Sequence, residues 1–174
     1  LSIQVGLFGE TSSGNDKQID DVNNITTRFT LLPINDGEKL LHLGVGFSSR
    51  NISDSIYSVS ARPENHLGTK LLDMDLPNVV GMNLMGAEMA FVTGPFSVQG
   101  EYVMNNVDAD KYYNFSGYYG QVSYFLTGEK RRYKNSLAGF DRVIPNNNMK
   151  EREGGGAFEL VARYSSMDLS EAQA

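Results

Sequence analysis

The stretch Tyr112-Tyr-Asn-Phe-Ser-Gly-Tyr-Tyr-Gly-Gln-Val-Ser-Tyr-Phe-Leu-Thr-Gly128 holds 17 consecutive residues without a formal charge. Its glycines, its Asn114 and its many aromatic residues disfavour a helix. Alternate residues separate into an apolar set and a mixed set of polar and aromatic side chains. The first set is Tyr118, Gly120, Val122, Tyr124 and Leu126, and the second is Tyr119, Gln121, Ser123 and Phe125. Such alternation, with aromatics at both ends, is typical of a strand that crosses a bilayer beside a watery lumen. The stretch therefore predicts a transmembrane β-barrel, and transport rather than catalysis.

The composition is compatible with this interpretation and excludes several others. A length of 174 residues predicts one domain, and the absence of cysteine excludes disulfides and thiol chemistry. A net charge of −6 gives no overall basic field, so we expect no nucleic-acid partner. The same charge would also suit a soluble acidic protein. The mean hydropathy of −0.32 is too polar for a helical membrane protein. A β-barrel tolerates it, because only alternate residues meet lipid.

The remaining sequence predicts an all-β fold in an antiparallel up-and-down meander. Asn35-Asp36-Gly37 indicates a tight hairpin turn, and Thr93-Gly94-Pro95 a second short turn. No segment has the apolar stripe of an amphipathic helix. Seven segments have the pattern of strands: residues 1–10, 24–33, 39–50, 79–92, 96–106, 113–127 and 156–166.

The strand predicted at residues 79–92 is the least regular. Its apolar residues fall on both faces, with Met82 and Leu84 opposite Met85 and Met89. A β-bulge near Gly86 would explain this pattern. A strand buried on both faces would also explain it, and would favour a soluble fold.

Two long connections, residues 51–78 and 128–155, separate the hairpins, and long connections are often functional. The chain begins inside a predicted strand without an initiator Met, and it ends in polar residues. We therefore expect it to be an internal portion of a longer protein.

Five blocks of the sequence, in order, resemble the phosphate-selective porin O and P family. The blocks are His42-Leu43-Gly44, Ala61-Arg62-Pro63-Glu64, residues 94–102 (Gly-Pro-Phe-Ser-Val-Gln-Gly-Glu-Tyr), residues 117–129 and residues 156–169. The resemblance implies a sixteen-stranded porin β-barrel in the outer membrane of a Gram-negative bacterium, assembled as a homotrimer, conducting anions and needing no cofactor. Residues 1–174 would be the middle portion of one barrel domain, about strands seven to thirteen, with no second domain. Short turns would then face the periplasm. Residues 51–78 would form an extracellular loop, and residues 128–155 an unusually long periplasmic connection.

An anion pathway needs positive charge along the lumen, and the planar fork of arginine suits phosphate. Strand parity points Arg28, Arg50 and Arg163 inward. Arg62 lies in a loop that, by the resemblance, folds into the barrel, and it is the leading candidate. Alternatively, Arg62 pairs with Glu64 and only holds the loop.

A basic cluster (Lys130, Arg131, Arg132 and Lys134) follows the aromatic strand. It could collect anions at a pore mouth. A solvated loop or a contact with lipid head groups is the plainer interpretation.

Other polar residues carry weaker expectations. His42 and His66 have no third ligand at metal spacing, so we expect no metal site. Glu101 and Glu159 point inward by parity, and we expect each to orient an inward arginine on a neighbouring strand.

The leading hypothesis is an outer-membrane porin, a passive channel whose partners are inorganic phosphate or other small anions and the surrounding lipid. A general small-solute porin and a structural outer-membrane barrel are alternatives. A soluble ligand-binding β-barrel is another, which would need no detergent. An enzyme is not expected, because no nucleophile elbow is present and Gly154-Gly-Gly156 lacks the context of a phosphate loop.

Overall fold

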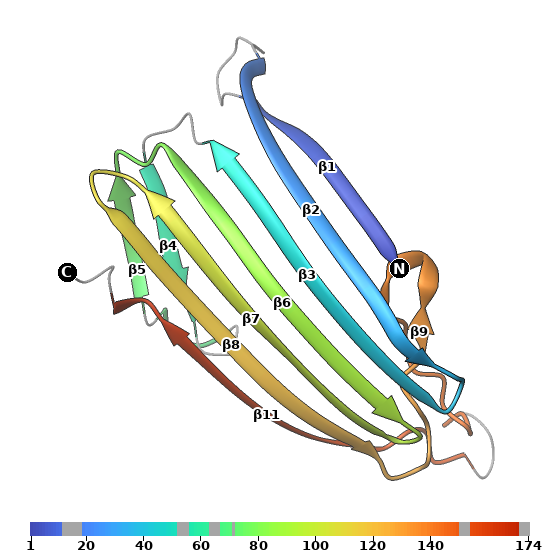
Figure 1. Ribbon diagram of the computed structural model, residues 1–174. Coiled ribbons are helices and arrows are strands. Elements are labelled where there is room, and N and C mark those ends of the chain that lie inside the picture. The colour runs from blue at the N-terminus through green and yellow to red at the C-terminus, as the bar shows by residue number, and fades with distance from the viewer. Residues whose placement is uncertain (12–18, 52–55, 63–66, 71, 150–153, 171–174) are drawn as a thin grey trace.

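The computed structural model consists mainly of β-strands and describes residues 1–11, 19–51, 56–62, 67–70, 72–149 and 154–170. Seven strands form one antiparallel sheet in the order β1-β2-β3-β6-β7-β8-β11 (Figure 1). They are β1 (Ser2–Thr11), β2 (Ile19–Asn35), β3 (Lys39–Asn51), β6 (Gly81–Thr93), β7 (Phe96–Asp108), β8 (Tyr112–Phe125) and β11 (Glu159–Asp168). The predicted meander is confirmed, and each predicted segment overlaps one of these strands. No helix among the described residues is long and apolar enough to span a membrane.

The two turns that the sequence predicted both lie at one end of the sheet, here called the short-turn end. At the β2–β3 turn, the Asp36 carboxylate accepts the backbone N–H of Glu38 at 3.0 Å and of Lys39 at 2.7 Å. These bonds to the ionised form lower the pKa of Asp36 below its usual value. Gly37 has a φ of 89° and Gly94, in the β6–β7 turn, a φ of 52°, a region that favours glycine.

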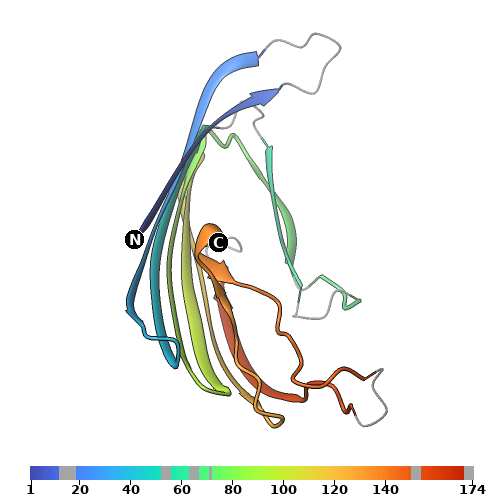
Figure 2. The same cartoon turned by 90° about the vertical axis from the view of Figure 1, so that its right-hand side faces the viewer.

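The sheet is curved (Figure 2). Its two faces differ in chemistry. Directly paired residues share a face of a sheet. On the convex face one such row runs across five strands: Phe29, Val45, Ala87, Tyr102 and Tyr118. The four large side chains of this row are 44–54% exposed, and five residues elsewhere on this face are exposed as well: Ile3, Val5, Met89, Val122 and Leu160. A continuous exposed apolar surface of this kind marks a face that meets lipid or a partner.

Two segments cover the concave face (Figure 2). One is a hairpin of β4 (Ile56–Ala61) and β5 (Leu72–Pro77), inside the connection after β3. The other, here called the inward segment (Tyr133–Phe140), joins β9 (Tyr133–Lys134), the 3₁₀ turn η1 (Asn135–Leu137) and β10 (Gly139–Phe140). The sequence pattern predicted neither of these hairpins.

The hairpin is held by the hydrophobic core of the molecule. Leu76 and Val79 are 1% and 2% exposed and pack with three residues of the sheet. Those three are Met82, Val107 and Phe115. The core therefore lies between the hairpin and the concave face, at the end of the sheet opposite the short turns.

This packing corrects both explanations that the sequence offered for residues 79–92. The bulge near Gly86 is wrong, because β6 pairs without interruption with β3 and β7 from Gly81 to Thr93. Burial on both faces is also wrong, because Met85 and Met89 are 43% and 50% exposed on the convex face. Met82 is apolar on the concave face because it packs against the hairpin.

Candidate functional site

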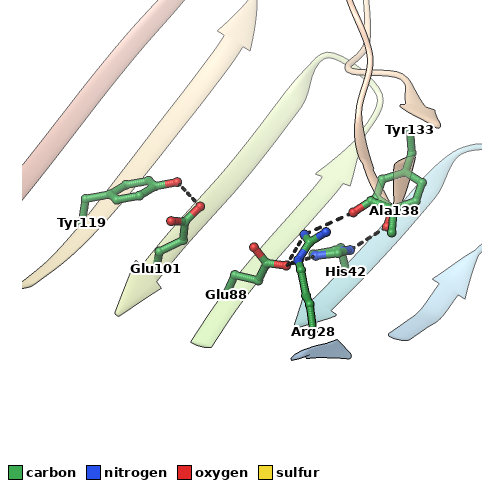
Figure 3. A network of polar contacts seen from close by, with 7 residues as sticks. All are labelled: Arg28, His42, Glu88, Glu101, Tyr119, Tyr133 and Ala138. Carbon is green, nitrogen blue, oxygen red and sulfur yellow. Dashed lines mark hydrogen bonds and ion pairs between the residues drawn. The ribbon is translucent and has the colours of Figure 1, made fainter. Parts of the chain in front are cut away.

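The centre of the concave face carries a polar network drawn from three strands and the inward segment (Figure 3). Arg28 of β2 forms an ion pair with Glu88 of β6, and its Nη2 also donates to the carbonyl oxygen of Ala138 at 3.3 Å. His42 of β3 lies between Glu88 Oε1, 3.1 Å from its Nε2, and the Tyr133 hydroxyl, 2.8 Å from its Nδ1. An ionised carboxylate only accepts hydrogen bonds, so the tautomer with its hydrogen on Nε2 fits both contacts: His42 donates to Glu88 and accepts from Tyr133 at Nδ1.

A hollow of about 200 Å³ separates this network from the next pair of polar strands. Arg28, His42, Glu88 and Phe140 line it on one side. Gln99, Glu101 and Tyr119 line it on the other. Glu101 accepts a hydrogen bond from the Tyr119 hydroxyl at 2.8 Å. The hollow thus has aromatic, amide and carboxylate walls, with Arg28 as the cation in its lining.

Three of the predicted arginines lie on the concave face, as strand parity indicated. Arg28 is tied to Glu88. Arg163 stacks its guanidinium over the Tyr119 ring, with Cζ 3.6 Å from the ring centre. Arg50, near the end of β3, is exposed and donates from Nε to Ser48 Oγ at 3.3 Å. Their part in anion passage stays a prediction.

Arg62 follows β4 directly and is exposed. It therefore belongs to the hairpin that covers the concave face, as a loop folded into a barrel would. The alternative pairing with Glu64 lies outside the described residues.

The basic cluster lies at the short-turn end, directly before and within the inward segment. Lys130 donates from Nζ to the carbonyl oxygen of Gly37 at 2.6 Å. Arg131 forms an ion pair with Glu159 at 2.9 Å and donates to Gln99 Oε1 at 3.3 Å. A second hollow, of about 250 Å³, is lined by four cations: Lys39, Lys130, Arg131 and Arg132. Lys134 is exposed on β9 and is not part of that lining.

The inward carboxylates behave differently from the prediction. Glu159 does pair with an arginine, but Arg131 belongs to the connection after β8 rather than to a neighbouring strand. Glu101 pairs with the Tyr119 hydroxyl, so the expected Glu101–arginine contact is wrong within the described residues. Glu88 and Glu101 are direct cross-strand neighbours, and like charges so placed repel. Glu88 reaches away from Glu101 to Arg28, which relieves this repulsion.

The connection after β8 is pinned at its base by Glu129. Its carboxylate accepts from the Thr127 hydroxyl and from the backbone N–H of Asn146, the latter at 2.9 Å. These hydrogen bonds lower the pKa of Glu129 below its ordinary value. In the inward segment, burial raises the pKa of Tyr133, so its phenol is neutral and able to donate to His42.

His42 is only 5% exposed, and His66 lies outside the described residues. Among the residues that the structure describes, no group of three or more His, Cys, Asp or Glu side chains could hold a metal ion.

Comparison with known proteins identifies the family. Residues 2–174 match the family described as phosphate-selective porin O and P. Over 181 aligned residues the chain is 31% identical to Porin O of Pseudomonas aeruginosa, an alignment that covers 90% of this chain and 40% of the relative. The chain belongs to the phosphate-selective porin O and P family. It spans about 40% of the length of the curated relative that it matches.

Membership in this porin family explains the two faces of the sheet. The family assigns the chain to a Gram-negative outer membrane, where the apolar convex face would meet lipid and the polar concave face would meet water. The predicted family, fold class and location are thereby confirmed.

Two residues of the porin's concave face were missed by sequence reasoning. Glu88 lies two residues beyond Gly86, and a bulge at Gly86 would have made it impossible to say which face of the sheet Glu88 occupies. If side chains alternate without interruption from Met82, Glu88 lies on the concave face. Tyr133 gave no signal, because its contact with His42 joins residues 91 positions apart in the sequence.

Proposed function

We propose that the full-length protein containing this chain forms a passive diffusion channel for anions, inorganic phosphate among them, across the outer membrane. The family supports this proposal, and so does the contrast between an apolar convex face and a charged concave face. The concentration gradient would drive transport, and the protein would supply charge and hydrogen-bond donors along the path.

The observation that carries the anion preference is the hollow at the short-turn end. Four cations line it, with Glu38 as the acidic residue in its lining. Within the described residues, Lys39 and Arg132 form no ion pair. Positive charge that no carboxylate neutralises raises the local concentration of anions and speeds their entry. The cluster would therefore collect phosphate at one mouth of the channel.

The seven strands would form the middle of a larger barrel. Among the residues that the structure describes, the outermost strands, β1 and β11, each pair on one side only, and unpaired strand edges are not tolerated in lipid. We propose that further strands of the full-length protein pair with these edges, giving the sixteen-stranded barrel and homotrimer that the sequence resemblance implies. The short-turn end would face the periplasm.

The test is planar-bilayer recording of the full-length protein, with the reversal potential measured under a salt gradient and phosphate added as a competitor of chloride current. A double variant, Lys39→Gln with Arg132→Gln, should weaken phosphate block about tenfold, equivalent to ~1.4 kcal/mol. Lys111→Gln is the matched control, because Lys111 is an exposed cation at the opposite end of the sheet. A reversal potential without anion preference, or equal effects of both variants, would contradict the collecting role.

Arg62→Ala tests the β4–β5 hairpin in the same recordings. If Arg62 lies in the narrowest part, its loss should weaken phosphate block and reduce anion preference together. If the change leaves both unaltered, Arg62 only shapes its loop.

A general small-solute porin is the second candidate, and one observation favours it. Two arginines on this side of the sheet are balanced by carboxylates, Arg28 by Glu88 at mid-depth and Arg131 by Glu159 near the short-turn end. A large conductance that phosphate does not block would favour this candidate.

A further inference from the structure

Glu88 poses a problem for an anion channel. It lies on the concave face near the middle of β6, where a carboxylate would repel the proposed solute. Yet its side chain is only 25% exposed, and its Oε1 is shared between two partners. Arg28 donates from Nε at 3.1 Å and from Nη2, and His42 Nε2 lies 3.1 Å away. The charge of Glu88 is therefore largely neutralised by Arg28, although Glu88 lines the hollow.

Gly44 makes this arrangement possible. Glu88 pairs directly with Gly44 of β3, so its side chain must cross β3 to reach Arg28 on β2. A Cβ atom at position 44 would overlap with Glu88 Oε1. The missing side chain of Gly44 is thus the gap through which Glu88 reaches its partners.

The same network holds the inward segment. Arg28 Nη2 donates to the carbonyl oxygen of Ala138, which is 2% exposed, and the Tyr133 hydroxyl bonds to His42. The Tyr133 ring lies against the His42 ring at 5.4 Å between centres and meets Phe140 edge-on at 5.6 Å. Both ends of the inward segment are therefore attached to side chains that Glu88 orients (Figure 3).

We propose that Glu88, Arg28 and His42 form a latch that holds the inward segment against the wall of the channel. Glu88 is a positioning residue, since it acts through Arg28 and His42 and not on the passing ion. The latch also helps to position Arg132, which directly precedes Tyr133, whereas Lys130 and Arg131 have their own contacts with Gly37 and Glu159. The conductance measurement that tests this inference rests on the proposed channel function. The spin-label measurement of segment mobility does not.

The structural test places a nitroxide label on Ser136→Cys, an exposed site in η1 of a chain without cysteine, in the full-length protein. Glu88→Gln keeps the shape of the side chain and removes its charge. The label should become mobile in this variant. Glu101→Gln is the matched control: it removes the same charge from the directly paired position on β7, but the hydrogen bond of Glu101 goes to Tyr119 and not to Arg28 or His42. An equally immobile label in wild type and Glu88→Gln would overturn the latch.

A second variant keeps the latch testable if Glu88→Gln does not fold. Tyr133→Phe removes one hydroxyl from the inward segment and leaves every wall residue intact, so the sheet should form normally. The label should gain mobility here too, by less than in Glu88→Gln, because Arg28 still holds Ala138. If Tyr133→Phe has no effect while the protein is folded, the His42–Tyr133 contact is not part of the latch.

Bilayer recording distinguishes a positioning role of Glu88 from a direct effect of its charge on the passing ions. Release of the inward segment should widen the path and raise the conductance of Glu88→Gln at least about twofold, with weaker phosphate block. Glu101→Gln removes a charge from the hollow without releasing the inward segment, so it should shift the anion preference and raise the conductance by less than Glu88→Gln does. Equal changes in both variants would mean that Glu88 acts as one more lumenal charge. Mobile labels in a protein without anion preference would refute the proposed function and leave the latch standing.

Discussion

At the scale of single residues, Gly100 and Gly120 show how closely β7 and β8 approach. They are directly paired and both face away from the concave network. A Cβ at Gly100 would lie 2.9 Å from the backbone carbonyl oxygen of Tyr119, whereas a Cβ at Gly120 would meet nothing within 4 Å. Because a backbone atom cannot swing aside like a side chain, Gly100→Ala should lower the free energy of unfolding by about 1–3 kcal/mol.

Gly120→Ala is the matched control on the opposite strand and should change stability little. Equilibrium unfolding of the refolded full-length protein in denaturant measures both variants. Equal stabilities would show that the two strands separate slightly at Gly100 without cost.

Residue orientation was readable from the sequence, and residue partnership was not. Parity placed Arg28, Arg50 and Arg163 inward because lipid on one side and water on the other enforce a strict period of two. That Arg28 binds Glu88, 60 positions away, depends on the gap at Gly44 and on the order of strands. The expectation that Glu101 would bind an arginine failed for the same reason. The alternation of residue types predicts which face of the sheet a side chain occupies, but only the tertiary structure determines which residue it contacts.

At the scale of elements, the seven sheet strands were predictable and the covering segments were not. Long strands with alternating chemistry carry a repeated signal. The β4–β5 hairpin and the inward segment are short, and contacts with distant residues such as Met82 and His42 hold them in place. Residues 128–155 therefore looked like a plain connection, although part of this stretch covers the concave face.

Glu129 should make the connection after β8 sensitive to acid. Its pKa is depressed in the folded protein, so its hydrogen bonds stabilise the connection at pH values above the ordinary pKa of 4.5. This contribution declines as the pH falls through 4.5 and is lost below the folded pKa. A nitroxide on Asn147→Cys should therefore gain mobility as the pH falls below 4.5.

Glu129→Gln isolates the cause of that change. The label should be mobile in this variant already at neutral pH, with no further gain on acidification. Trypsin should also cleave faster after Lys130, Arg131 and Arg132, which directly follow the altered residue. A pH response that survives in Glu129→Gln would assign the titration to another group.

At the scale of the whole molecule, the two faces of the sheet decide between a membrane barrel and a soluble one. Val45 and Val103 are both valines near the middle of central strands, 54% and 39% exposed. Val45 lies in the convex row with Phe29 and Tyr102, and Val103 lies on the concave face beside Glu101 in the lining of a third hollow. A charge at the middle of the bilayer is costly, whereas a charge facing a lumen is hydrated.

Val45→Arg should therefore destabilise the protein in phospholipid vesicles by about 2–4 kcal/mol. Val103→Arg should leave stability nearly unchanged and should increase anion current, because it adds a cation to the path. Equilibrium unfolding from vesicles and bilayer recording measure these two effects. In a soluble barrel with a water-exposed convex face, Val45→Arg would be harmless. Equal stabilities of the two arginine variants would therefore contradict the assignment of the convex face to lipid. A loss of stability that occurs in Val45→Arg and not in Val103→Arg shows that the convex face is the one that meets lipid.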